Sequence, residues 1–501
     1  MIINKKNLIL LFLQYNYINC FTNILRLNKP SNILRLNKPF TNIKMINKLN
    51  KNEFGDFNWK KNWYPIALEK YTDKKNPFKF TLLGENLVIW WDHKNKKWNS
   101  MIDKCPHKLV PLSEGRINNN GNIECPYHGW TFNCTGNCIS IPHHPNYKIK
   151  KHFNGKAYYT TNKQGIIWIW PENIEINKKP PDKKLIPICK ELDDKNTFYL
   201  DTFSDLPYDY TLLVENVLDI SHVPYTHHGS QGLRKNAYPI KYKKKLFSNF
   251  GIILNHNLSV IPGSYNNNIS LNSVTYFQAP CYQYTKVENK HIKILLASYA
   301  VPINEGYSRV IVRLPIITFK NPLLKILNIF LIKPTFLHHM FISKVLEEDT
   351  IFLNGQQNIL LFNNKNLYKL PTSSDTPTIL WRKWLNNTEP IPWKSNRLNK
   401  KYIWATRSEL LDRKTFHLDH CTTCQKAYNN LEIIKKILIF LMPNIIFLGV
   451  PLLQIYNPIN NILFDTMLCA TILGILGNLL YICDKLQSRM VKGPYPPKRN
   501  I

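Results

Sequence analysis

The chain has 501 residues, of which 44% are hydrophobic, so it can bury a sizeable core and is too long and too apolar for a disordered protein. Its formal net charge of +33 comes from lysines scattered along the whole chain, without a concentrated basic stripe or a nucleic-acid-binding module. We therefore expect no nucleic acid as a partner. Eleven cysteines are too sparse and too unevenly spaced for a disulfide scaffold, and their clusters at 105–138 and 421–424 indicate metal or redox chemistry.

The first fifty residues predict a targeting leader. They contain no Asp or Glu, eight Lys or Arg, and one apolar run, Leu8–Leu13, that is too short to span a bilayer. The sequence NILRLNKP occurs twice, at 23–30 and 32–39, which indicates little structure. We expect residues 1–52 to be a signal and transit peptide in tandem, with an unstructured leader that carries no address as the alternative.

Two folded domains are expected after the leader. Short strand-like runs such as FKFTLL, NLVIWW and GIIWIW, bounded by turn residues, predict a small antiparallel β domain over residues 57–175. The polar, proline-bearing segment 171–184 predicts a linker. Strands and helices mix in the second domain, residues 185–430, where 336–362 is the best helical stretch.

Two apolar runs follow these domains, Ile437–Ile455 and Ile462–Cys483. Each is close to the roughly 20 residues that cross a hydrocarbon core. We interpret residues 437–483 as a transmembrane helical hairpin, since proline is tolerated in such spans and Asp465 lies at the edge of the second. The alternative is a buried amphipathic pair in a soluble domain.

The strongest motif is Cys105-Pro106-His107, followed after seventeen residues by Cys125-Pro126-Tyr127-His128. One Cys and one His in each half offer two thiolates to one iron and two neutral imidazoles to the other iron of a [2Fe–2S] cluster. A Cys₂His₂ zinc site is the alternative, but its usual ligand spacing differs. Cys105, His107, Cys125 and His128 are therefore the predicted cluster ligands.

A second iron site is predicted from ENVLDISHVPYTH at 215–227. Asp219 and His222 are three positions apart and would share a helix face, and Pro224 would end or bend that helix so that His227 reaches the same metal. Two imidazoles and one carboxylate form the facial triad of a non-haem Fe(II) oxygenase.

We choose Asp349, in VLEEDTIFLNGQQ, as the third ligand of this triad. Glu347 and Glu348 remain alternatives, as does a solvated acidic turn without a metal. The motif C-x-x-C at Cys421 and Cys424 predicts a redox-active thiol pair. A zinc site that adds His417 and His420, or inert thiols, are the other interpretations of that motif.

The cluster motif CPHKLVPLSEGRI…CPYHGW, preceded by NWYPIA at 62–67, resembles the Rieske domain of ring-attacking oxygenases. The pattern N-x-x-D-x-x-H-x₄-H at 216–227 resembles their mononuclear site. This resemblance implies that His222 and His227 bind iron. It also implies that Asp219 links the two metal centres through a cluster histidine of a neighbouring subunit, and hence a ring-shaped oligomer, typically a homotrimer.

The order of the motifs over about residues 57–485 resembles the plastid oxygenases that include pheophorbide a oxygenase, chlorophyllide a oxygenase relatives and the Rieske protein of the inner-envelope import machinery. The resemblance implies an α+β fold, with an antiparallel β Rieske domain, a helix-grip (START-like) catalytic domain and the transmembrane hairpin. It further implies a chlorophyll-derived tetrapyrrole as substrate and a plastid location, in the inner envelope or the thylakoid membrane.

The expected activity is that of a monooxygenase or dioxygenase that uses O₂. Since the sequence has no G-x-G-x-x-G motif or flavin site, a separate ferredoxin and its reductase would supply electrons. The rival hypothesis is a redox-sensing subunit of a protein-import complex, in which the C-x-x-C pair is the sensor.

Overall fold

The structure is a computed structural model, and the leader predicted at 1–52 lies outside its described residues. It describes residues 57–174, 179–193, 197–258, 270–288, 293–318, 334–362, 367–393, 405–456 and 462–500. Residues 53–501 form one compact unit.

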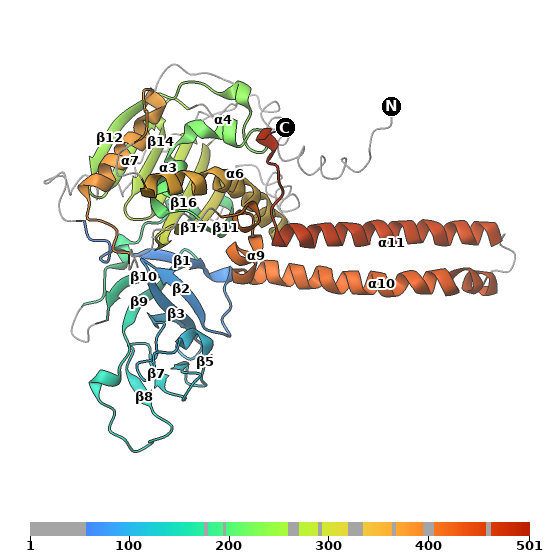
Figure 1. The fold of residues 1–501 in the computed structure, drawn as a ribbon, viewed down its shortest axis with the longest axis horizontal. Helices are drawn as coiled ribbons and strands as arrows, with labels where there is room; N and C mark the ends of the chain where they lie inside the picture. The colour runs from blue at the N-terminus through green and yellow to red at the C-terminus, as the bar shows by residue number, and fades with distance from the viewer. Residues whose placement is uncertain are drawn as a thin grey trace. The chain divides into compact units, whose positions relative to one another are not determined.

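The first domain contains a six-stranded antiparallel sheet in the order β1-β10-β9-β4-β3-β2 (Figure 1). Its strands are β1 (Tyr64–Leu68), β2 (Phe78–Leu82), β3 (Glu85–Asp92), β4 (Lys97–Ile102), β9 (Ala157–Lys163) and β10 (Ile166–Asn173). A four-stranded sheet of β5 (Arg116–Ile117), β6 (Ile123–Glu124), β7 (Thr131–Phe132) and β8 (Cys138–Ser140) is inserted between β4 and β9.

Strand β3 explains why the sequence of this domain reads as continuous apolar runs. Side chains alternate between the two faces of a strand, and both faces of β3 are buried. Leu87 and Ile89 pack in the large core shared with the second domain, whereas Val88 and Trp90 pack with Cys105 and the inserted sheet. The same strand thus supports the predicted cluster motif and joins it to the rest of the protein.

The second domain is a seven-stranded antiparallel sheet in the order β11-β17-β16-β15-β14-β13-β12. The strands are β11 (Thr197–Leu206), β12 (Tyr242–Ser248), β13 (Gly251–His256), β14 (Ser270–Gln278), β15 (Tyr282–Glu288), β16 (Lys293–Asn304) and β17 (Tyr307–Thr318). Helix α3 (Tyr210–Leu218) contacts β14–β17, α6 (Thr335–Phe362) contacts β11, and α7 (Thr376–Asn387) contacts β12 and β13. A sheet gripped by helices is the expected catalytic fold, and α6 confirms the helix predicted at 336–362.

Aromatic side chains fill the core between these helices and the sheet. Trp381 and Trp384 of α7 are fully buried and stack at 5.3 Å between ring centroids. Trp59 of the first domain contacts Tyr210 and Trp384, so one core extends across both domains. The guanidinium of Arg309 also joins them, because it donates to the Ile66 carbonyl and pairs with Asp205.

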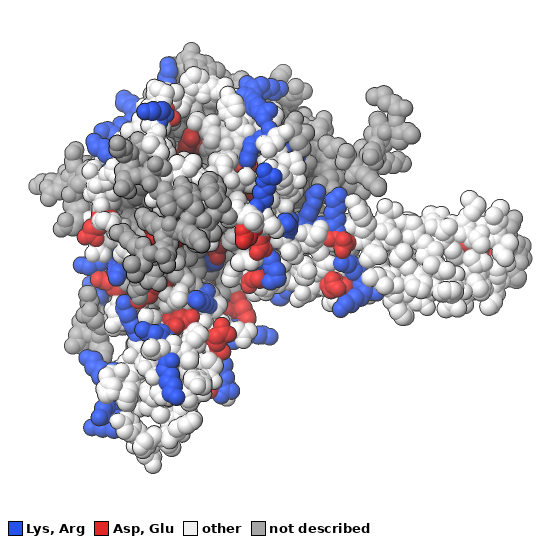
Figure 2. Space-filling model, viewed as in Figure 1, with Lys and Arg blue, Asp and Glu red and all other residues white. Residues whose placement is uncertain are grey.

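The last helices are α8 (Arg407–Leu410), α9 (Arg413–Phe416), α10 (Thr422–Tyr456) and α11 (Ile462–Val491). Figure 1 shows α10 and α11 side by side, and both are long and apolar enough to cross a membrane. Only 6% and 11% of their apolar windows are buried, which does not fit a pair buried in a soluble domain. Asp465 is the single charged residue over 437–483, and Figure 2 shows charged side chains gathered at the base of the pair.

Candidate functional site

Two loops with matching backbone geometry carry the predicted cluster ligands. In the first, the Cys105 amide donates to the Val110 carbonyl, and the Leu109 amide returns to the Cys105 carbonyl. In the second, the Cys125 amide donates to Trp130, and the Gly129 amide returns to Cys125. The fourth residue after each cysteine has a positive φ, 62° at Leu109 and 70° at Gly129. The two halves of the motif therefore form two equivalent fingers.

On both fingers the cysteine side chain is buried and the histidine side chain lies nearer the surface. The Cys105 and Cys125 thiols are buried, and burial raises the pKa of Cys105, so a thiolate there requires a metal cation. The His107 and His128 rings lie next to each other on the outer side, with centroids 4.7 Å apart. Trp130 stacks on His107 and fixes the plane of that ring. Two buried sulfurs behind two outer imidazoles suit a cluster with one iron on each pair.

The second predicted site begins where helix α3 ends. Asp219 is the C-cap of α3, and its extended conformation (φ −83°, ψ 91°) breaks the helix. The 3₁₀ turn Ile220–His222 and the short helix α4 (Val223–Thr226) follow, with Pro224 in the first turn of α4. The expectation that Pro224 ends the helix was wrong, because the break occurs at Asp219 and proline is well accommodated at a helix start. His222 and His227 still meet, with ring centroids 5.2 Å apart.

Asp349 of α6 completes the group formed by the two histidines. Its Oδ1 lies 3.8 Å from His222 Nε2, and its Oδ2 lies 3.4 Å from His227 Nε2. Asp349 Oδ1 is buried and accepts no hydrogen bond, as expected for an oxygen that faces a cation. The arrangement of two imidazoles and one carboxylate fits a non-haem iron centre.

Hydrogen bonds made by the Nδ1 atoms of His222 and His227 determine that each ring presents its Nε2 atom to the metal site. The Nδ1–H of His222 donates to the Asp219 backbone carbonyl. The Nδ1–H of His227 donates to Glu348 Oε2 at 2.9 Å, and the hydroxyl of Ser230 donates to the same carboxylate. In the neutral rings, both Nε2 atoms therefore carry the lone pairs that a metal beside Asp349 would bind.

The three adjacent acids of α6 have different partners. Asp349 faces the histidines, Glu348 orients His227, and Glu347 forms an ion pair with the guanidinium of Arg413. All three are buried, so the alternative of a solvated acidic turn was wrong. Burial lowers the pKa of His227, but its hydrogen bonds with Asp349 and Glu348 outweigh this effect and raise the pKa to about 9. In the absence of a metal, a proton thus supplies the positive charge that the acids require.

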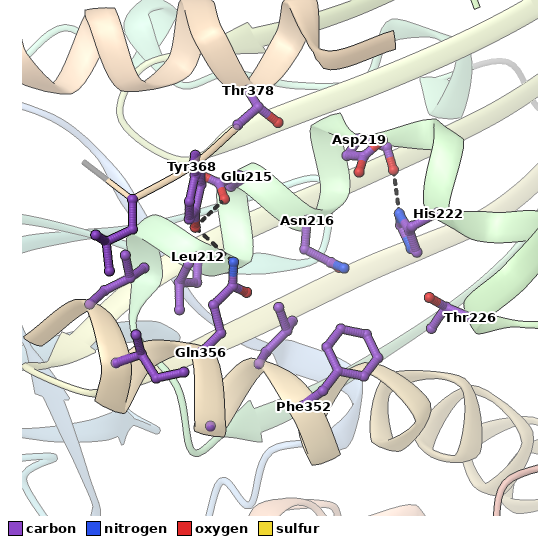
Figure 3. Close-up of a pocket in the computed structure, with 15 residues that line it drawn as sticks. Leu212, Glu215, Asn216, Asp219, His222, Thr226, Phe352, Gln356, Tyr368 and Thr378 are labelled. Atoms are coloured by element: carbon purple, nitrogen blue, oxygen red, sulfur yellow. Dashed lines mark hydrogen bonds between the residues drawn. The ribbon is translucent and has the colours of Figure 1, made fainter. Parts of the chain in front are cut away.

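A cavity of about 790 Å³ opens beside His222 (Figure 3). It lies between α3 and α6, and Phe352 and other apolar side chains line most of it. Besides His222 and Phe352, the residues that line the cavity are Leu212, Glu215, Asn216, Asp219, Thr226, Leu353, Gly355, Gln356, Ile359, Leu360, Leu367, Tyr368 and Thr378. Its volume falls within the roughly 300–1,000 Å³ of sites for small organic molecules. The carboxylate of Asp219 is half-buried at this cavity and accepts from the Ser221 amide.

The segment that follows α11 contacts the loop around His227. After α11, Lys498 Nζ donates to the Gly229 carbonyl at 3.1 Å. Arg499 Nη1 donates to the carbonyl of Glu348 and, at 3.4 Å, to that of Thr226. The C-terminal segment therefore contacts both chain segments that carry the triad.

A second group of metal-binding side chains surrounds the C-x-x-C motif. It consists of His339, His417, Cys421 and Cys424, all buried. His420, which the sequence suggested as a zinc ligand, is exposed and is not part of this group, because it lies on the outer side of the turn Leu418–His420. His339 takes its place from helix α6. The pair His338–His339 in an apolar helix was the only sequence signal that pointed to it.

Two family models match parts of the chain. The family described as Rieske [2Fe-2S] domain matches residues 62–153, and the family described as pheophorbide a oxygenase matches residues 277–366. The second range includes all of α6 and therefore Asp349.

Curated relatives match over most of the chain. Pheophorbide a oxygenase of Arabidopsis thaliana is 31% identical over 78% of this chain and 76% of its own length. Flavonoid 8-hydroxylase 2 of Ocimum basilicum is 30% identical over 76% and 75%, and protein TIC 55 of Arabidopsis thaliana is 30% identical over 77% and 76%. Among solved structures, dicamba monooxygenase bound to 3,6-dichlorosalicylic acid shares the fold, with a TM-score of 0.51 and 19% identity over 66% of this chain and 98% of that one.

Proposed function

We propose that this protein oxygenates a chlorophyll-derived tetrapyrrole with O₂. The premise is that the chain belongs to the Rieske non-haem iron oxygenases and, within them, to the family of pheophorbide a oxygenase. The observation that carries this proposal is the position of the His222, His227 and Asp349 group at an apolar cavity of about 790 Å³. Such a cavity excludes water from a reactive centre and buries a large planar ring system.

The chain's own residues have distinct tasks in this reaction. Bound to the protein, the [2Fe–2S] cluster supplies electrons and the mononuclear iron supplies the activation of O₂. His222 and His227 present their Nε2 atoms, while Glu348 holds the tautomer of His227. At the α7 side of the cavity, Glu215 accepts from Tyr368 and Arg382, which gives polar groups that can orient an oxygen-bearing edge of the substrate.

Electron transfer between subunits is part of the proposal. His107 is exposed and His128 is half-buried, so this edge of the cluster site is open to a partner. Asp219 is half-buried, and its backbone carbonyl holds His222. We infer a homotrimer in which Asp219 of one subunit would accept a hydrogen bond from a cluster histidine of the next and would thus link the two metal sites across the interface.

The proposal extends to the electron donors and to the location of the protein. A ferredoxin with its reductase would supply electrons, and an acidic ferredoxin suits the net charge of +33. Relatives named chloroplastic support a plastid location, with residues 1–52 as the import leader. The exposed apolar surface of α10 and α11 supports anchoring in a plastid membrane.

The proposal is tested with full-length protein purified in detergent, reconstituted anaerobically with iron and supplied with ferredoxin and its reductase. Addition of ¹⁸O₂ should give a mass gain on a chlorophyll-derived tetrapyrrole, and His222→Ala should abolish it. His228→Ala is the matched control, since His228 Nδ1 accepts from the Arg234 amide and does not belong to the triad group. Oxygenation of flavonoids alone would refute the substrate class, and no oxygenation of any substrate would refute the activity.

A second candidate function, a redox-sensing subunit of an import complex, is favoured by the similarity to protein TIC 55 and by the C-x-x-C motif. It requires Cys421 and Cys424 to exchange disulfides with a partner. Loss of function on Cys421→Ser with unchanged O₂ uptake would favour this candidate over the oxygenase.

A further inference from the structure

Four side chains from three separate segments meet at the base of helix α10. His339 comes from α6, His417 follows α9, Cys421 precedes α10, and Cys424 lies in its first turn. None is more than 5% exposed, and their ligand atoms lie within 4.8 Å of one another. This group is separate from the residues assigned to either iron site.

Backbone carbonyls fix the tautomers of both histidines in this group. The Nε2–H of His339 donates to the Asp201 carbonyl at 3.2 Å, and the Nδ1–H of His417 donates to the Phe203 carbonyl at 2.7 Å. A carbonyl can only accept, so in the neutral rings the opposite nitrogens, His339 Nδ1 and His417 Nε2, carry lone pairs. These two nitrogens face each other at 3.1 Å. Two lone pairs repel at that distance unless a metal ion or a proton lies between them.

The spacing of the ligand atoms agrees with a small tetrahedral ion. Zinc bonds of about 2.0–2.1 Å to nitrogen and about 2.3 Å to sulfur separate the two nitrogens by about 3.3 Å and each nitrogen from a sulfur by about 3.6 Å. In the structure, the nitrogens are 3.1 Å apart, and the Cys424 sulfur is 3.2 Å from His339 Nδ1 and 3.3 Å from His417 Nε2. The Cys421 sulfur is 3.7 Å from His339 Nδ1.

Charge and access favour a metal over a thiol-exchange pair. Two thiolates and a divalent cation form a neutral unit, which can be buried without an uncompensated charge. Disulfide exchange needs an accessible sulfur, whereas Cys421 is 0% and Cys424 3% exposed. Both cysteines are free in the structure.

We propose that His339, His417, Cys421 and Cys424 form a structural zinc site. Binding of Zn²⁺ displaces one proton from each thiol and leaves no open position for a substrate. The ion ties α6, which also carries Asp349, to the start of α10. It thereby fixes the apolar helix pair to the catalytic domain, and this role does not depend on the oxygenase activity.

The test is elemental analysis of the full-length protein purified in detergent without added zinc. We expect about one zinc per chain, in addition to iron. Cys424→Ser and His417→Ala should lose that zinc and keep the cluster absorbance, whereas Cys134→Ser, a half-buried cysteine outside the site, should keep both. No zinc in the wild-type chain, or zinc that survives both substitutions, would overturn the proposal.

A second measurement does not depend on the folding of variants. Wild-type protein expressed in medium with cobalt should show the visible absorption bands of tetrahedral Co²⁺ together with thiolate-to-metal charge transfer. In the zinc-containing protein, X-ray absorption at the zinc edge should give two sulfur and two nitrogen neighbours. A mass two hydrogens below that of the reduced chain, mapped to a Cys421–Cys424 disulfide in protein free of zinc, would identify a redox pair instead. Iron at this position in place of zinc would also overturn the assignment.

Discussion

Iron binding at the mononuclear site should depend strongly on pH through His227. The pKa of this histidine is about 9 in the metal-free chain, because its hydrogen bonds with Asp349 and Glu348 outweigh the effect of burial. Fe²⁺ requires the neutral ring, so a proton must leave His227 when the metal binds. The apparent affinity for Fe²⁺ should therefore rise about tenfold per pH unit below pH 9 and become level above it.

The size of this effect follows from the distance between the working pH and the pKa. At pH 7, about two units below the pKa, proton competition weakens iron binding about 100-fold, which is about 2.7 kcal/mol. Glu348→Gln removes one of the two charges that raise the pKa, so the pH dependence should become weaker. The same substitution disturbs the orientation of the ring and should lower the affinity at high pH by roughly 10–100-fold.

The assay is anaerobic competition between the metal-free protein and a calibrated chelator for Fe²⁺, at a series of pH values between 6.5 and 8.5. Glu389→Gln, an exposed glutamate far from the triad in sequence, is the matched control and should behave as the wild type. An affinity that does not change with pH over this range would refute the reasoning. It would mean either that His227 does not bind the metal or that its pKa is not raised.

Three further predictions concern other residues. Glu347→Gln should lower the free energy of unfolding by roughly 3–5 kcal/mol in chemical denaturation, because it leaves the buried Arg413 without its charge partner; an effect below about 1 kcal/mol would contradict a buried ion pair. Gly129→Ala should reduce cluster absorbance and thermal stability, since Gly129 has a φ of 70° and a Cβ there would lie 2.9 Å from Pro142 Cγ; unchanged cluster content would contradict the finger geometry. Co-expression of Cys125→Ser with His222→Ala should restore partial turnover, because mixed trimers pair an intact cluster with an intact iron site on the neighbouring subunit; no restoration would exclude transfer between subunits.

The sequence predicted best what is local along the chain. The cluster motif is contiguous within each half, so spacing alone identified Cys105 and Cys125 as equivalent positions in two loops. His222 and His227 were also predicted from a short segment, although the break between them was assigned to Pro224 and lies at Asp219. Proline restricts the backbone in several ways, and sequence cannot tell whether it ends one helix or begins the next.

Contacts between distant segments could not be predicted with the same precision. Glu347, Glu348 and Asp349 are adjacent in sequence, and only the turn of α6 against the rest of the fold gives each a different partner. His339 joins Cys421 and Cys424 from about eighty residues away, and no spacing rule connects them. The small antiparallel β domain and the pair of membrane helices were predicted from strand-like runs and apolar segments, which depend on periodicity along the chain and require no knowledge of distant contacts. The helix-grip catalytic fold was instead expected from the resemblance to a known family.

The return of the chain end to the triad loop has a practical consequence for how this protein is handled. Lys498 donates a hydrogen bond to the Gly229 carbonyl, and Arg499 donates one to the Glu348 carbonyl. A deletion that begins beyond α11 would remove these hydrogen bonds. Iron occupancy would then fall in material whose helix pair and core are intact, so residues 498–499 should be kept whenever the protein is produced.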